Sequence, residues 1–314
     1  GGGKDSCYAA HILKYRYGMN PLTVTWPPIL YTKYGYENFK KWLETGKLKN
    51  ISAKRNEDVL RILTKNAFLN LLHPFQSFIL GQKIFPIKCA IKYKIPLIFY
   101  GENEAEHGNS LADNESSLRK KSFHTLNSLE NFFLGGMSLD EIKTKYKIGL
   151  KDLEDYIPPH TDEFNNSNIK VHYLGYFLRW IPQECFYYSV ENCGFKPRPF
   201  RTQGTYSKYN SIDDKIDDLN FYTLFTKFGI GRATYDVSQE LRNDHLNVEE
   251  GKKLIKKYDG EYPDRYMKEI LDYLDISKNK FNERVNAFRS PHLWKKTKST
   301  WKLRHTVNKD GVDD

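Results

Sequence analysis

The chain has 314 residues, which is enough for one large domain or two ordinary ones with a sizeable hydrophobic core. A composition of 39% hydrophobic and 15% aromatic residues excludes a disordered chain, and no stretch approaches the roughly 18 apolar residues of a membrane-spanning helix. The net charge of +10 predicts an anionic partner. Because the lysines and arginines occur in short scattered runs, the sequence disfavours a nucleic acid as that partner.

The cysteines and the first residues indicate a compartment. Cys7, Cys89, Cys185 and Cys193 are scattered, and their spacing fits neither a zinc site nor a disulfide framework. No charged-then-apolar signal segment opens the chain. We therefore expect a cytoplasmic protein.

Helical and β-rich segments alternate from residue 1 to about residue 106. Short strands are predicted before the proline pair at 27–28, after Gly46 and before Gly101. The predicted segments are a helix at 6–17, a strand at 22–26, a helix at 38–45, a strand at 49–53, a mostly helical stretch at 57–95 and a strand at 96–100. This alternation predicts an α/β fold with an open parallel sheet and flanking helices.

The chain changes character after about residue 106. Residues 107–166 are polar and helical, with a break at 135–136, and are expected to form an insertion or lid-like element. An aromatic β-like run follows at 171–180, and helices are predicted at 212–229, 248–258, 264–274 and 281–289. The basic tail from Trp294 is expected to be loosely ordered. We expect a first domain at 1–200 and a mainly helical substrate- or partner-binding region at 201–314.

The opening segment GGGKDSCYAAHILKYRYG can be interpreted in two ways. A glycine-rich turn that leads directly into a helix presents backbone N–H groups at the positive end of the helix dipole, which suits a phosphate. Lys4 adds a cation and Ser6 a hydroxyl. The alternative is a glycine linker followed by a surface helix. The first six residues, GGGKDS, do not by themselves decide between the two interpretations.

The same six residues resemble the PP-loop, SGGxDS, of the N-type ATP pyrophosphatases. Gly2, Gly3, Asp5 and Ser6 match the motif, whereas Gly1 stands where its first serine occurs. The resemblance implies that the loop grips the phosphates of ATP while ATP is cleaved to AMP and pyrophosphate. It also implies a sheet strand before the loop, and we expect that strand to be missing from the sheet.

Two later segments are expected to meet this loop. The strand at 22–26 ends in Thr25 and Trp26, where the resemblance places the adenine. The strand at 96–100 is followed by Gly101, Glu102 and Asn103. Because ligands collect at the carboxyl ends of parallel strands, the three segments are predicted to converge on one crevice. Glu102 and Asp5 are the candidate Mg²⁺ ligands, while a solvated loop carboxylate is the alternative for Glu102.

More of the chain resembles the N-acetyl sugar amidotransferases of bacterial surface-polysaccharide and flagellin-glycan biosynthesis. The resemblance extends through IPLIFYGENEAEHG, VHYLGYFLRW, RTQGTYSKYNSIDDKIDD and GIGRATYDVSQELR, and so covers most of the chain. It implies an ATP-dependent conversion of the acetamido group of a nucleotide-activated sugar into an acetamidino group. Ammonia would come from a separate glutaminase subunit. Relatives also carry an upstream cysteine-rich segment, which is expected to be absent here.

Several later residues are candidates for this chemistry. Lys4 and Lys208 are predicted to stabilise phosphate charge during catalysis, and the resemblance supports a late lysine in that role. Arg232 is predicted to bind the anionic substrate, together with Asn103 and His107. Surface ion pairs are the alternative for Lys208 and Arg232. Four aspartates at 213, 214, 217 and 218 either assist a cation or form a solvated helix start.

Two other functions remain open at this point. A PP-loop adenylating enzyme that modifies tRNA would explain the positive charge, although the chain lacks a cysteine pair for sulfur relay. A non-catalytic scaffold that binds a glutaminase would keep the fold without the chemistry. Steep weakening of binding by salt would distinguish the RNA-binding enzyme.

Overall fold

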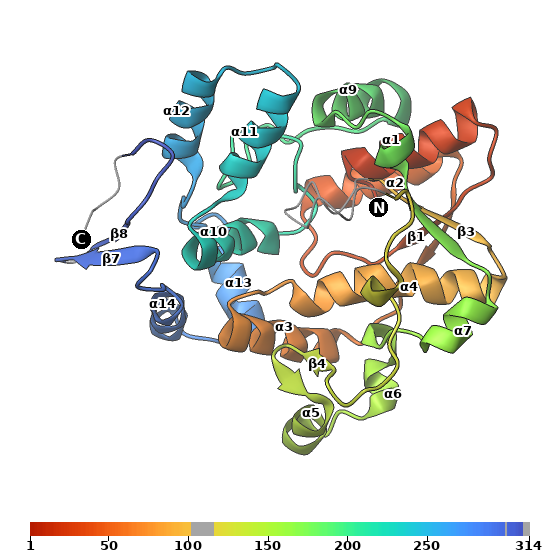
Figure 1. Ribbon diagram of the computed structural model, residues 1–314, viewed down its shortest axis with the longest axis horizontal. Helices are drawn as coiled ribbons and strands as arrows, with labels where there is room; N and C mark the ends of the chain where they lie inside the picture. The colour runs from red at the N-terminus through yellow and green to blue at the C-terminus, as the bar shows by residue number, and fades with distance from the viewer. Residues whose placement is uncertain (102–115, 299, 310–314) are drawn as a thin grey trace.

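The structure is a computed structural model that describes residues 1–101, 116–298 and 300–309. The described part is mixed α/β and largely helical (Figure 1). The predicted Glu102, Asn103 and His107 lie outside the described residues.

The first hundred residues alternate between helix and strand, as predicted. The elements are α1 (Lys4–His11) with a π-helical extension (Ile12–Arg16), β1 (Leu22–Thr25), α2 (Lys33–Gly46), β2 (Lys49–Ser52), α3 (Glu57–Leu71), α4 (Gln76–Tyr93) and β3 (Leu97–Tyr100). Thr32 caps α2 by accepting the Gly35 N–H at 3.0 Å. Asn56 caps α3 in the same way. Side-chain oxygens at these positions satisfy N–H groups that the helix leaves without partners.

Four of the described strands pair in parallel, as predicted, but they form two separate two-stranded sheets. Strand β1 pairs with β2, with Leu22 opposite Lys49, and β3 pairs with β6 (Lys170–Tyr173), with Leu97 opposite Lys170. No strand among the described residues joins the two pairs, so a single open sheet is not formed by them. Helix α4 contacts both β1 and β3 and so holds the pairs on a common support. Helices α1 and α2 lie on the other side of the strands (Figure 1).

Residues 116–166 contribute to the core. Strands β4 (Phe133–Leu134) and β5 (Met137–Ser138) form a hairpin that turns at Gly135 and Gly136, which have φ of 60° and 73°. Positive φ at both positions explains the two glycines. The helices that follow are α5 (Leu139–Tyr146), α6 (Leu150–Leu153) and α7 (Thr161–Asn166). Leu134, Ile142 and Leu153 are each at most 1% exposed and belong to the main core cluster.

The last third of the chain is helical, with one difference from prediction. After α8 (Leu174–Phe177) and α9 (Pro182–Cys193) come α10 (Ile216–Phe228), α11 (Arg232–Arg242), α12 (Val248–Tyr258), α13 (Met267–Leu274) and α14 (Lys278–Ala287). The expectation of a loosely ordered tail is wrong, because β7 (Trp294–Thr297) and β8 (Thr300–Leu303) form an antiparallel hairpin. The Trp294 ring is buried, and its Nε1 donates to the Thr226 carbonyl at 2.8 Å.

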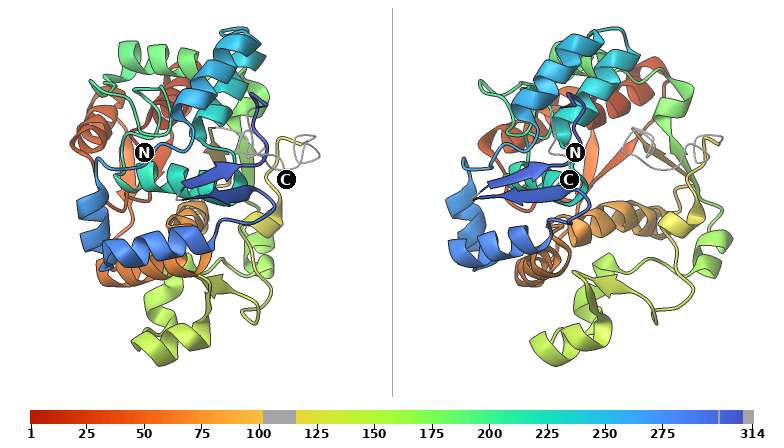
Figure 2. Two further views of the ribbon diagram at one scale, coloured as in Figure 1. Left: turned by 90° about the vertical axis from the view of Figure 1, so that its left-hand side faces the viewer. Right: turned by 60° about the vertical axis from the view of Figure 1, so that its left-hand side comes forward.

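One core cluster joins residues from both sides of position 200. Leu60 and Phe68 of α3 belong to it, as do Ile270 of α13 and Phe281 of α14. The Phe68 and Phe281 rings stack with centroids 5.4 Å apart. In Figures 1 and 2, α13 and α14 accordingly lie beside α3. The C-terminal helices therefore complete the core of the first half.

Candidate functional site

The opening glycines form a tight loop that hydrogen bonds close onto α1. The Ser6 Oγ accepts from the Gly2 N–H and donates to the Gly3 carbonyl, both at 2.9 Å. Gly2 has φ +96°, and a Cβ there would lie 2.7 Å from the Phe39 Cα, so only glycine fits. Gly3 is the N-cap residue, and no side chain caps the helix. The start of α1 can therefore receive an anion.

Lys4 and Asp5 place opposite charges beside this loop. The Lys4 Nζ lies 2.7 Å from each Asp5 carboxylate oxygen. Lys4 is only 4% exposed, and its Nζ lies 5.9 Å from the centroid of the Tyr209 ring. Half-exposed Asp5 remains open to solvent on one side. A buried ammonium that already sits at the loop can neutralise phosphate charge without first being ordered.

Helix α1 is fixed in place through α9. The Ser189 Oγ donates to the Lys4 carbonyl at 2.8 Å, and the Cys193 Sγ donates to the Cys7 carbonyl at 3.5 Å. All four residues are buried. These contacts fix the start of α1, and with it the loop, against the later part of the chain.

The ends of two strands meet the loop, as the sequence predicts. A Cβ built on Gly1 would lie 2.9 Å from the Thr25 Oγ1 at the end of β1. A Cβ built on Gly101, directly after β3, would lie 3.9 Å from the Asp5 Cβ. Thr25 and Gly101 therefore flank the loop from two different strands. The same test at Gly1 gives 2.2 Å to the Trp42 ring, which leaves no room for the serine of the PP-loop motif.

The Trp26 side chain, unlike Thr25, does not lie beside the loop. Its ring is 5% exposed and packs edge-on against Tyr156, with centroids 5.5 Å apart. A Cβ on Gly81 of α4 would lie 2.3 Å from the Trp26 ring. Only the backbone of Trp26 is therefore placed to contact a ligand near the loop.

Lys208 lies in a tightly bonded loop beside Lys4. The Thr202 N–H donates to the Ser207 carbonyl at 2.9 Å, and the Arg198 N–H donates to the Lys208 carbonyl at 3.0 Å. Arg198 is 1% exposed, and its guanidinium donates to the Thr202 hydroxyl. The Lys208 side chain is exposed, directly before the Tyr209 ring that Lys4 faces. The backbone thus holds Lys208 next to the candidate site.

Arg232 is engaged within its own helix. Its Nε donates to the Asp236 carboxylate at 2.8 Å, and its guanidinium lies 5.2 Å from the Phe221 ring centroid. Asp236 also accepts from the Thr205 hydroxyl at 2.5 Å. Arg232 therefore belongs to a polar network that reaches the loop carrying Lys208.

Two of the four aspartates are buried, so the solvated helix start is wrong for them. Asp214 and Asp218 are 4% and 2% exposed. Asp214 accepts from the N–H groups of Ile29, Leu30 and Ile216, and thus ties α10 to the segment before α2. Burial raises the pKa of Asp218 to about 6. The pKa of the partly buried Asp217 is also raised, because its carboxyl group is shielded from solvent and lies near Asp213.

The burial of Asp214 predicts a pH dependence of stability. Burial raises its pKa to about 7, although three backbone N–H donors act in the opposite direction. Between about pH 4 and 7 the folded chain then holds a proton that the unfolded chain has released. The free energy of unfolding therefore falls as pH rises through this window, by at most about 1.4 kcal/mol per unit for one group.

Replacing Asp214 with asparagine removes this titration. We expect the unfolding free energy of Asp214→Asn, relative to the unmodified chain, to rise by about 1 kcal/mol per pH unit between pH 5 and 7. Urea unfolding of the variant and of the unmodified chain at pH 5, 6 and 7 measures this difference in unfolding free energy. The exposed Asp140→Asn is the control and should show no such trend. A relative stability of Asp214→Asn that falls with pH would show a depressed pKa instead.

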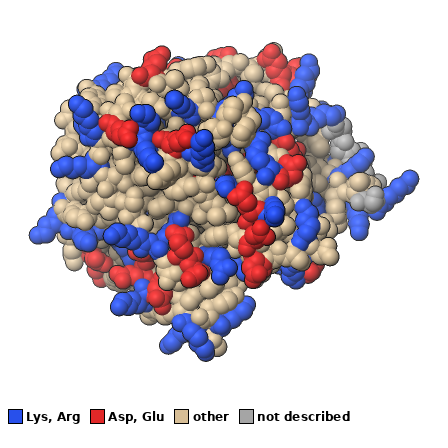
Figure 3. Space-filling view, turned by 180° about the vertical axis from the view of Figure 1, so that it is seen from behind, with Lys and Arg blue, Asp and Glu red and all other residues tan. Residues whose placement is uncertain are grey.

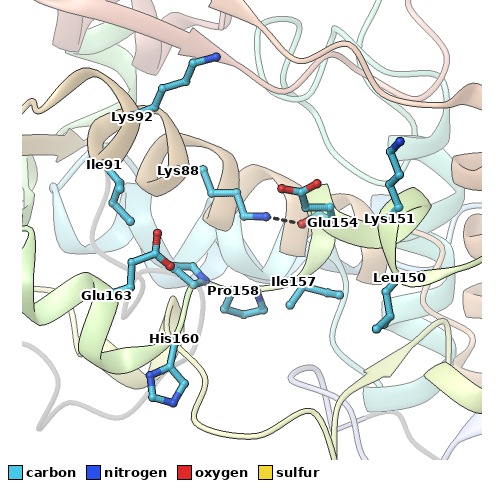
Figure 4. A pocket seen from close by; sticks show the side chains of 11 residues that line it. Lys88, Ile91, Lys92, Leu150, Lys151, Glu154, Ile157, Pro158, His160 and Glu163 are labelled. Atoms are coloured by element: carbon cyan, nitrogen blue, oxygen red, sulfur yellow. Dashed lines mark hydrogen bonds between the residues drawn. The ribbon is translucent and has the colours of Figure 1, made fainter.

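A hollow of about 670 Å³ lies elsewhere, between α4 and residues 150–163 (Figure 4). Lys88, Lys92 and Lys151 point around it, with Glu154 and Glu163 among them. The Lys88 ammonium donates to the Glu154 carbonyl. None of the predicted site residues lines it. The hollow is therefore separate from the loop at Gly1–Ser6.

The described residues do not indicate a metal centre, and the face shown in Figure 3 does not indicate a basic groove. No group of three histidine, cysteine or acidic side chains among the described residues could hold a metal ion. Of the predicted Mg²⁺ ligands, only Asp5 is described, and it contacts Lys4. On the face in Figure 3, basic and acidic side chains are interspersed. No described helix is both long enough and apolar enough to cross a membrane.

Sequence reasoning missed the aromatic neighbours of the loop. The Trp180 ring lies against Gly101, since a Cβ there would be 2.9 Å from its Cη2. Tyr8 of α1 meets Trp180 edge-on, with ring centroids 5.2 Å apart. The aromatic run at 171–180 is a signal for these contacts, but it is equally typical of core.

Comparison with known proteins gives a family match for the last third of the chain. Residues 203–308 match the family model of the LPS biosynthesis protein WbpG-like, C-terminal domain. This match covers the loop with Lys208, Arg232 and the helices from α10 to α14. No curated protein matches the chain. The matched region supports a protein of lipopolysaccharide biosynthesis.

Proposed function

We propose that this chain is an ATP-dependent amidotransferase of surface-polysaccharide biosynthesis that converts the N-acetyl group of a nucleotide-activated sugar into an acetamidino group. The observation that carries the proposal is the loop Gly1–Ser6, which Thr25 and Gly101 flank from the ends of two strands. The WbpG-like match at 203–308 supports the pathway. We propose further that β1 and β3 belong to a single open parallel sheet. The strand that the PP-loop resemblance implies before the loop would lie between them.

The proposed reaction has two steps. The carbonyl oxygen of the acetamido group attacks the α-phosphorus of ATP, and the bond from that phosphorus to pyrophosphate breaks. Ammonia then adds to the activated carbon, and AMP leaves with the former amide oxygen, which gives the amidine. The protein must position the amide, stabilise phosphate charge and exclude water.

The residues near the loop fit these tasks. The backbone at Gly2 and Gly3, closed by Ser6, forms a turn that can receive phosphates, and a Cβ on Gly2 would disrupt that turn by meeting the backbone of Phe39. Lys4 stabilises charge within the loop, and exposed Lys208 does so from the neighbouring loop. Asp5 is the described residue that would hold a phosphate-bound Mg²⁺. Arg232 binds the anionic substrate, and its hydrogen bond to Asp236 holds it in position.

Pyrophosphate release tests the proposal directly. The chain is incubated with ATP, Mg²⁺, ammonium and a panel of nucleotide-activated N-acetyl sugars, and pyrophosphate and AMP are measured. We expect release that depends on one of the sugars. Ammonium replaces the proposed glutaminase partner, so activity with ammonium and none with glutamine is the expected pattern. No sugar-dependent release with any sugar would refute the enzyme assignment.

The variant Ser6→Ala tests whether activity depends on the loop rather than on the stability of the fold. The change removes the hydroxyl that closes the loop onto Gly2 and Gly3, and we expect pyrophosphate release to fall about 10²-fold or more. Stability should change by only about 1–2 kcal/mol, since two hydrogen bonds are lost. Asp5→Ala should abolish release while the protein melts normally. Ser128→Ala, at an exposed position whose hydroxyl also accepts from one backbone N–H, is the matched control. Full activity in both loop variants would show that the loop is misassigned.

A further inference from the structure

A pair of exposed aromatic rings lies beside the candidate site. Tyr176 and Phe177, at the end of α8, are 50% and 55% exposed. Their rings meet nearly at right angles, with centroids 5.4 Å apart and an interplanar angle of 75°. Phe177 is also supported edge-on by Phe99 and His172 from the paired strands β3 and β6. The two rings therefore form a rigid apolar corner at the protein surface.

Backbone contacts place this corner next to the loop. The Gly175 N–H donates to the Gly101 carbonyl at 2.9 Å, directly before Tyr176. The Trp180 ring lies against both glycines, with its Cβ 3.4 Å from the Cβ position of Gly175. Gly101 in turn approaches Asp5. The rings thus follow the carboxyl ends of β3 and β6, where ligands of parallel strands collect.

Two polar groups in the same segment lack partners within the described residues. The Trp180 Nε1 is buried and has no hydrogen-bond acceptor among them. A buried donor without an acceptor is costly, and an acceptor on a bound ligand would remove that cost. Arg179 is exposed, and no ion pair within the described part of the chain involves it. One short segment therefore offers flat apolar rings, a donor and a cation.

We propose that residues 176–180 bind the nucleoside diphosphate part of the activated sugar, a substrate class that rests on the proposed function. The base stacks in the corner of Tyr176 and Phe177, and Arg179 binds the diphosphate. A flat base fits two rings at right angles, with its face on one and its edge toward the other. The Trp180 indole donates to an acceptor of the bound nucleotide. The sugar then extends toward the loop at Gly1–Ser6.

Paired ligands test the assignment by direct binding, without turnover. The probes are N-acetylglucosamine carried on uridine, cytidine, guanosine or deoxythymidine nucleotides, and N-acetylglucosamine 1-phosphate, which lacks a base. Titration calorimetry with the unmodified chain finds the nucleotide that binds best. Because binding is measured without ATP, a chain that binds but releases no pyrophosphate would refute the reaction and leave this site standing.

The variants Tyr176→Ala and Phe177→Ala should each weaken binding of the best nucleotide sugar by about 5- to 150-fold. Binding of N-acetylglucosamine 1-phosphate should stay within about twofold, whereas Arg179→Met should weaken both ligands. Matched controls are Phe228→Ala, also 55% exposed, and Tyr93→Ala, 49% exposed, and both should bind as the unmodified chain does. The proposal is overturned if no nucleotide sugar binds, if the ring variants bind normally, or if they weaken both ligands equally, which would place the sugar on the rings.

Discussion

Lys4→Met is expected to slow pyrophosphate release about 10²- to 10³-fold, because it removes a cation already positioned at the loop. Lys4 is buried, so its ammonium does not have to be recruited from solvent when charge develops on the phosphates. Methionine has a similar length, and Asp5 keeps contact with solvent, so the fold should lose little stability. Steady-state release at saturating ATP measures the effect.

Lys40→Met is the control for the loss of one positive charge near the same region. Lys40 lies on the surface of α2, with its Nζ 4.3 Å from the Tyr36 ring centroid, and takes no part in the loop. Its variant should retain nearly full activity. Equal losses in the two variants would show a general effect of net charge, and normal activity of Lys4→Met would exclude Lys4 from catalysis.

Gly2→Ala is expected to lower the free energy of unfolding by about 2–4 kcal/mol, since it combines left-handed strain with overpacking. The φ of +96° is unfavourable for alanine, and the new methyl group would lie 2.7 Å from the Phe39 Cα and 2.9 Å from the Phe39 nitrogen. Because both atoms belong to the backbone of α2, they cannot rotate away. Urea unfolding at constant pH measures the loss, and pyrophosphate release should be lost with it.

Gly3→Ala is the matched control in the next position. Gly3 has φ −74°, and a Cβ there would meet nothing within 4 Å. As a change at an N-cap without a side-chain hydrogen bond, it should cost less than about 1 kcal/mol. If Gly2→Ala proves as mild as Gly3→Ala, the loop adopts a different conformation in solution.

Much of the secondary structure could be predicted from local pattern. The helix predicted at 248–258 matches α12 in both ends, and the strand at 22–26 matches β1 to within one residue. Asn247 caps α12, with a capping box to Glu250, which explains the sharp start. The hairpin from Trp294 could not be predicted, because its order depends on burial of one indole against α10.

The candidate site could be predicted only where glycine and polar residues follow strands. Gly101 was predicted to approach the loop for this reason, and the structure brings it close to Asp5. The burial of Trp26 could not be predicted, because Gly81, far away in the sequence, makes room for its ring. The burial of Asp214 likewise depends on distant N–H groups, at Ile29 and Leu30, that helical spacing does not reveal.

The core that crosses residue 200 constrains how this protein can diverge or be recombined. A chimera that joined the first 200 residues to the C-terminal third of a relative would set Phe68 against a foreign residue in place of Phe281. Substitutions on α3 and on α13 or α14 must therefore compensate each other, even though they lie on opposite sides of that boundary. The matched segment at 203–308 therefore shares one hydrophobic core with the first half of the chain.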